Sequence, residues 1–140
     1  MPAHIDTTSS PIILHTLTGN LELPDLALYL HQQEQLLQGD TRFVSIIVAT
    51  KFGKAETQAI RQYVYWFRKN RELASQKWLG MALVFDALPR FLFSLYLLVG
   101  NLPAPYFMAD RFESALAWSL ERLSQAKIPH PATLPKKPIL

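Results

Sequence analysis

The hydrophobic pattern divides the chain into short apolar runs separated by longer amphipathic segments. The runs are rich in β-branched and aromatic residues and are bounded by glycine, proline, asparagine or aspartate, which is typical of strands. The run FVSIIV is apolar almost throughout, as in a strand that is covered on both faces. Four strands are predicted: Ile12–Leu17, Phe43–Val48, Leu79–Phe85 and Tyr106–Ala109.

In the segments between these strands, apolar residues recur at helical spacing. The first helix begins at Pro24 and ends before Gly39, and a long second helix is expected across residues 54–77. A third helix, Arg90–Val99, stops at Gly100, and Asp110 is positioned to cap the last helix with Glu113 three residues later.

The resulting element order is βαβαβαβα, which predicts an α/β fold with a four-stranded, mainly parallel or mixed sheet and packed helices. The first ten residues are small and polar and are expected to form a flexible arm. Residues 11–126 are expected to form a single domain. Residues 127–140 hold four prolines and no periodic pattern, so we expect a disordered tail.

The helix Arg90–Val99 is unusually apolar, because Ser94 is its one polar residue after Arg90. A helix that is apolar on every side has to be covered on every side. We rank a second copy of the chain first, a partner protein second and a membrane surface third, while the last helix and the tail are a further possible cover. The expected interface residues are Phe91, Leu92, Leu95, Tyr96 and Leu98.

Positive charge is concentrated in one segment. The chain of 140 residues has a net charge of +3, but residues 51–77 carry +5 and the remainder carries −2. Arg61, Arg68 and Arg71 are therefore predicted to bind an acidic protein partner. The same helix holds four consecutive or near-consecutive aromatic rings, so a nucleic acid or another anionic surface is an alternative ligand, unless those rings belong to the core.

Residues with catalytic or metal-binding chemistry are sparse. The chain has no cysteine, and its four histidines are not spaced as metal ligands, so no metal or cofactor is expected. Phosphate-binding, dinucleotide-binding and nucleophile motifs are absent. One alternative function remains open at the strand ends, where Thr50, Asp86 and Arg90 could line a small-molecule or enzyme pocket. Asp86 and Arg90 could equally form a local turn pair.

Several segments together resemble a known family. A helix ending LLQGDTRF, the strand SIIVAT, the helix RQYVYWFRKNRELASQKW, the strand GMALVF and the segment PAPYFMA occur in that order. This order resembles the small bacterial STAS-like proteins, which share the fold of anti-sigma-factor antagonists. The resemblance implies a non-enzymatic protein-interaction module with regulatory function.

The family's phosphorylation switch is not matched in this sequence. The resemblance would imply a serine, usually preceded by aspartate, after a central strand. The corresponding segment reads ATKFGKAET, in which Thr50 and Thr57 are the only hydroxyl residues and neither follows an aspartate.

The expected location is the bacterial cytoplasm. The first residues lack the basic start and long apolar run of a signal peptide. The most apolar window, Leu79–Val99, is interrupted by Asp86, Pro89 and Arg90 and predicts no membrane-spanning helix.

Overall fold

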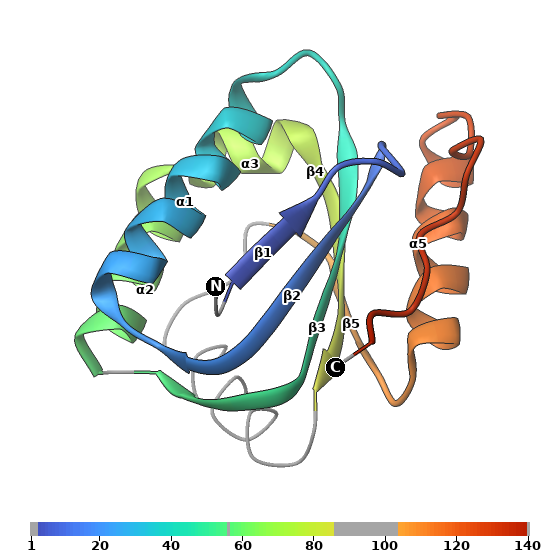
Figure 1. Ribbon diagram of the computed structural model, residues 1–140. Coiled ribbons are helices and arrows are strands. Elements are labelled where there is room, and N and C mark those ends of the chain that lie inside the picture. The colour runs from blue at the N-terminus through green and yellow to red at the C-terminus, as the bar shows by residue number, and fades with distance from the viewer. Residues whose placement is uncertain (1–2, 56, 86–103, 140) are drawn as a thin grey trace.

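A computed structural model describes residues 3–55, 57–85 and 104–139, apart from the side chains of residues 21, 50–55 and 57. Within these residues the strands form one five-stranded mixed sheet in the order β1-β2-β3-β4-β5 (Figure 1). β1 pairs with β2 in antiparallel orientation, and the other three pairs are parallel. The strands are β1 (Ala3–Asp6), β2 (Ile12–Leu21), β3 (Phe43–Ala55), β4 (Trp78–Phe85) and β5 (Tyr106–Ala109).

The α/β class is confirmed, but the strand count differs from the four predicted strands. The additional strand, β1, lies in the segment that was expected to be a flexible arm. Ala3 and Ile5 pair with Leu17 and His15, respectively. β1 therefore forms one edge of the sheet, although its alternating apolar pattern is only four residues long. The turn after β1 is held by Asp6, whose Oδ1 accepts hydrogen bonds from the backbone N–H and the hydroxyl of Thr8.

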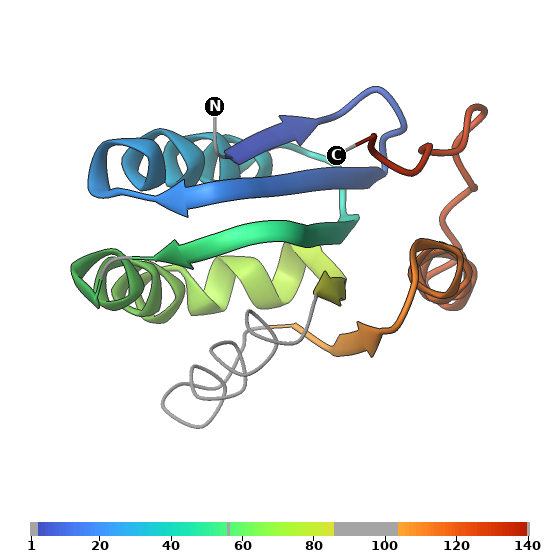
Figure 2. The same ribbon diagram turned by 60° about the horizontal axis from the view of Figure 1, so that its bottom comes forward.

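Helices cover both faces of this sheet (Figures 1 and 2). α1 (Leu23–Gln38), α2 (Thr57–Lys69) and α3 (Arg71–Lys77) lie on one face, and α5 (Phe112–Gln125) lies on the other. The single helix predicted across residues 54–77 is therefore two helices. They divide at Asn70, whose backbone leaves helical geometry (φ −103°, ψ 13°) and whose side-chain amide donates to the carbonyl of Trp66.

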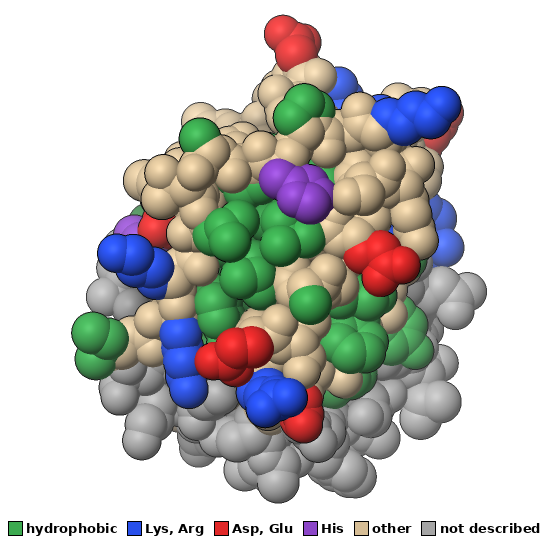
Figure 3. All heavy atoms as spheres, turned by 90° about the vertical axis from the view of Figure 1, so that its right-hand side faces the viewer, with side chains coloured by type: hydrophobic (Ala, Val, Ile, Leu, Met, Phe, Trp, Pro, Cys, Tyr) green, Lys and Arg blue, Asp and Glu red, His purple; other side chains and the backbone are tan. Residues whose placement is uncertain are grey.

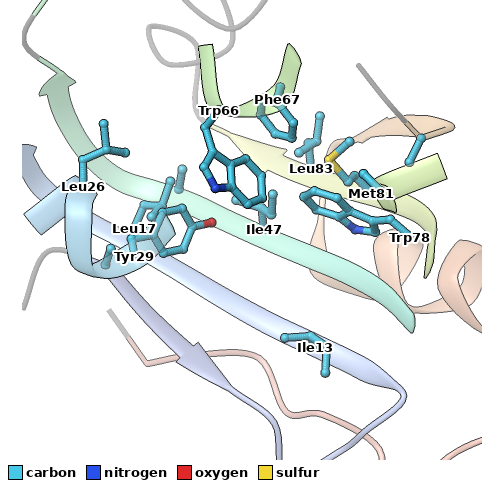
Figure 4. Close-up of a cluster of buried hydrophobic side chains, with 14 of the residues drawn as sticks. Ile13, Leu17, Leu26, Tyr29, Ile47, Trp66, Phe67, Trp78, Met81 and Leu83 are labelled. Atoms are coloured by element: carbon cyan, nitrogen blue, oxygen red, sulfur yellow. The ribbon is translucent and has the colours of Figure 1, made fainter. Parts of the chain in front are cut away.

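The apolar run in β3 is explained by this double cover. Phe43 and Ile47 pack on the side of α1–α3, whereas Val44, Ile46 and Val48 pack on the side of α5. Figure 4 shows the larger cluster, in which Trp66 meets Phe67 edge to face and Phe67 stacks on Trp78. Each face of the sheet thus has its own apolar core.

α5 approaches the sheet closely at one glycine of β4. A Cβ atom at Gly80 would lie 2.6 Å from Cη2 of Trp118, so the indole ring packs directly on the strand backbone. The same ring stacks on Phe107 of β5 with centroids 5.7 Å apart. Gly80 therefore permits the contact that fixes α5 across β4 and β5.

Candidate functional site

Three polar side chains meet in the core between the sheet and α1. A hydrogen bond of 2.6 Å joins Nδ1 of His15 to the hydroxyl of Tyr29, and one of 3.1 Å joins Nε2 of His15 to the hydroxyl of Ser45. All three residues are fully or almost fully buried, with exposed fractions of 0–1%. They come from β2, α1 and β3, so the cluster connects two strands to a helix.

The fold brings these residues together through strand and helix periodicity. On β2, Ile13, His15 and Leu17 point toward α1, and Ser45 lies beside Ile13 in the parallel register. Tyr29 belongs to the buried side of α1 together with Leu26, Gln33 and Leu37.

Burial controls the charge of this cluster. Removal from water lowers the pKa of His15 to about 3, because an imidazolium is poorly solvated in the core. Burial also raises the pKa of Tyr29 and of the neighbouring Tyr63. At neutral pH His15 therefore carries one proton, and its two ring nitrogens act as one donor and one acceptor between the two hydroxyls.

Further polar contacts continue from this cluster between α1 and α2. Gln33 Nε2 donates to the hydroxyl of Tyr63 at 3.3 Å, and Trp66 Nε1 donates to Glu34 Oε1 at 3.0 Å. The rings of Tyr29 and Tyr63 meet edge to face with centroids 6.1 Å apart. These contacts fix the position of α2 relative to α1.

A serine hydroxyl within reach of a histidine resembles the nucleophile and base of a hydrolase, but accessibility argues against that chemistry here. His15 and Ser45 are both 0% exposed, so a substrate has no route to either side chain in this structure. We interpret the cluster as a structural polar contact in the core. Histidine spacing alone gives no indication of this contact, whereas the position of His15 within the apolar run IILHTL is typical of a buried side chain.

The predicted partner-binding arginines lie on the outer surface of the layer formed by α2 and α3. Arg61, Arg68 and Arg71 are all exposed. Arg61, Tyr65 and Arg68 follow the spacing i, i+4, i+7 and so share one face of α2, and Tyr65 is 64% exposed. We call Arg61, Tyr65, Arg68 and Arg71 the basic surface.

The other aromatic residues of α2 belong to the core. Trp66 and Phe67 are each 5% exposed, and Tyr63 stacks on Phe67 with centroids 4.8 Å apart. Of the four rings considered for nucleic-acid stacking, Tyr65 is therefore the one that reaches the outer surface.

The remaining predicted site residues fall outside the described part of the chain. This holds for Asp86 and Arg90 of the strand-end pocket and for Phe91, Leu92, Leu95, Tyr96 and Leu98 of the expected interface. Thr50 lies in β3, but its side chain is also outside the description. Both the pocket and the interface remain predictions.

Surface hollows also occur elsewhere among the described residues. A groove of about 320 Å³ between β5 and α5 is lined by Tyr106, Trp118 and Arg122, among others. Arg122 uses its Nε and Nη2 to donate to the carbonyl of Leu79 and lies 5.9 Å from the centroid of the Trp118 ring. This guanidinium therefore has a structural role, because it holds α5 against the start of β4.

Within the described ranges, no three histidine, aspartate or glutamate side chains are arranged to hold a metal ion. No helix in this part of the chain has the length and apolar character needed to cross a bilayer.

Comparison with known proteins identifies the fold. No protein-family model and no curated protein matches the chain. A solved structure of an uncharacterized DUF3478-family protein with a SpoIIAA-like fold, from Shewanella loihica PV-4, superposes with a TM-score of 0.63 at 16% sequence identity. The match covers 84% of this chain and 91% of that one.

A second solved structure, an enoyl-CoA hydratase from Bacillus anthracis, reaches a TM-score of 0.40 at 16% identity, over 59% of this chain and 39% of that one. A similarity at that level carries no argument. The similarity to the Shewanella protein, which extends over most of both chains, shows that this protein has the SpoIIAA-like, or STAS-like, fold that its sequence predicts.

Proposed function

We propose that this protein is a non-enzymatic regulatory module that binds an acidic protein partner through its basic surface. The observation that carries the proposal is the placement of Arg61, Tyr65 and Arg68 on one exposed face of α2, together with the exposed Arg71 in the first turn of α3. Exposed arginine and tyrosine side chains are enriched at the energetically dominant positions of protein interfaces.

Charge supports an acidic partner. Residues 57–77, which contain α2 and α3, carry five lysine or arginine residues against the single carboxylate of Glu72. A concentrated positive surface attracts negatively charged partners and increases their association rate, especially at low ionic strength.

The aromatic residues favour a protein over a nucleic acid. Binding of single strands needs several exposed rings on which successive bases stack. Trp66 and Phe67 are committed to the core, so Tyr65 is the one ring of α2 available for such contacts.

A titration with defined probes tests the proposal. A fluorescent polyglutamate peptide represents an acidic protein segment, and a single-stranded DNA oligonucleotide represents the alternative. The triple variant Arg61→Glu/Arg68→Glu/Arg71→Glu should weaken peptide binding at least tenfold, and wild-type affinity should fall as salt rises.

A matched control separates the basic surface from net charge. The variant Arg111→Glu/Lys136→Glu/Lys137→Glu makes the same change in charge at exposed positions outside that surface, and we expect its peptide affinity to change less than threefold. Equal losses in both variants would contradict the proposal. Tighter binding of the oligonucleotide than of the peptide would favour the nucleic-acid alternative instead.

A further inference from the structure

α5 leaves part of its own sheet face to be covered by another segment. It packs mainly on β3, β4 and β5. On the same face, however, Ile12 and Leu14 of β2 are 0% and 7% exposed and belong to the α5-side core. A second element must contribute to the cover of β2.

The chain turns back toward β2 directly after α5. Lys127 has a left-handed conformation (φ 59°), and its N–H donates to the carbonyl of Ser124, while the N–H of Ile128 donates to the carbonyl of Leu123. This pair of bonds is a Schellman motif, which ends a helix and reverses the chain. Ile128 then packs against the core cluster that contains Ile12 and Leu14.

The rest of the tail follows a defined path without helix or strand, in contrast to the disorder expected from its composition. His130 Nε2 and the hydroxyl of Ser124 are hydrogen-bonded at 2.8 Å. Figures 1 and 2 show the tail running back beside α5, on the side where β2 lies. Pro135 is buried, whereas its neighbour Leu134 is 45% exposed, so the tail has an inner and an outer side.

Figure 3 shows the resulting surface, in which apolar side chains gather between charged ones on the face of α5 and the tail. We propose that residues 127–139 act as a strap, which shields the apolar strip of Ile12 and Leu14 and exposes that strip when it is released. The strip lies on the opposite side of the sheet from the basic surface.

Thiol labelling of the 140-residue chain tests this strap, because this sequence has no cysteine. Leu14→Cys places a thiol under the strap, and Ile13→Cys places one on the opposite, α1 side of the same strand. Each is combined with Pro135→Asp, which puts a charge on the inner side of the strap, or with Leu134→Asp, the matched control on its outer side.

We expect Pro135→Asp to increase the labelling rate of the cysteine at position 14 at least tenfold and to leave the cysteine at position 13 protected. Leu134→Asp should change neither rate by more than twofold. An unchanged rate at position 14 would overturn the proposal. Equal increases at positions 13 and 14 would also overturn it, because they would show opening of the whole domain.

Binding of an apolar dye to cysteine-free Pro135→Asp and Leu134→Asp chains gives a second readout, with an increase expected for Pro135→Asp alone.

Discussion

At position 15 an ionisable residue occupies a place that strand periodicity assigns to the apolar core. His15 is tolerated there because both ring nitrogens are hydrogen-bonded, to Tyr29 and to Ser45, and because burial keeps the ring neutral. The unfolded chain does not have this constraint, so an unfolded histidine is protonated near its ordinary pKa of about 6.5. Between pH 6.5 and pH 3 the unfolded state therefore binds one more proton at this position than the folded state.

His15 should make the domain less stable as pH falls. Because the unfolded state binds the extra proton, its free energy drops relative to the folded state by about 1.4 kcal/mol for each pH unit below 6.5. We expect the free energy of unfolding to decrease by about 2 kcal/mol between pH 7.5 and pH 5, a range in which most carboxylates stay ionised. Urea unfolding at a series of pH values measures this change.

Two glutamine variants test whether His15 causes this decrease in the free energy of unfolding at low pH. His15→Gln can keep hydrogen bonds to both hydroxyls without titrating, so its stability should vary less with pH over this range, even if it is lower at neutral pH. His31→Gln, at an exposed position of α1, should retain the wild-type pH dependence. The same pH dependence in wild type and His15→Gln would contradict a neutral buried histidine.

The partners of His15 could not be read from the sequence, because they are set by the packing of separate elements. Tyr29 lies 14 residues away and Ser45 lies 30 residues away. The periodicity of each segment predicts an inward-facing tyrosine on a helix and a strand through Ser45. Only the register between β2 and β3 and the position of α1 bring the three side chains together.

At the scale of single elements, the end of α5 departs from the usual choice of residue. The position after a helix C-cap that adopts a left-handed conformation is most often glycine, and here it is Lys127 with φ 59°. A side chain with a Cβ atom costs about 1 kcal/mol in this conformation. The turn that leads into the tail is therefore maintained against a local steric cost.

Lys127→Gly should stabilise the domain relative to Lys127→Ala by about 0.5–1 kcal/mol, corresponding to roughly 3 °C in melting temperature. The alanine variant is the matched control, because both substitutions remove the lysine charge from the helix end and only glycine removes the Cβ atom. Thermal unfolding of the two variants under the same buffer conditions measures the difference. Equal stability would mean that the left-handed turn does not persist in solution.

Elements with a strong hydrophobic pattern were predicted well, and the errors occur where tertiary contacts determine the secondary structure. The predicted strand Phe43–Val48 lies within β3, and Tyr106–Ala109 matches β5. β1 was missed because four residues are too few for a pattern, and its pairing with β2 determines its conformation. The division between α2 and α3 was missed because apolar spacing continues from Phe67 to Ala74 through Asn70.

At the scale of the whole molecule, the predicted helix Arg90–Val99 lies outside the described residues, and its cover remains a prediction. One cover considered from the sequence was the last helix with the tail. In the structure the buried side of α5, with Phe112, Ala115 and Leu123, packs on the sheet. Ile128 at the start of the tail packs in the same core. These apolar surfaces of α5 and the tail are therefore already occupied by the sheet.

Self-association through residues 90–99 is the prediction that follows. A specific dimer interface buries about 800 Å² on each partner, and the row of aromatic and aliphatic residues predicted for that helix could supply much of it. We expect light scattering to show a wild-type dimer and the variant Leu95→Glu/Leu98→Glu to be monomeric, because buried unpaired carboxylates oppose association.

Leu28→Glu, at a 44% exposed position of α1, adds the same type of charge outside the predicted interface and should remain dimeric. A wild-type monomer at all concentrations would contradict the prediction and point to a different protein as the cover for this helix. A dimer that persists in Leu95→Glu/Leu98→Glu would instead place the interface on another surface.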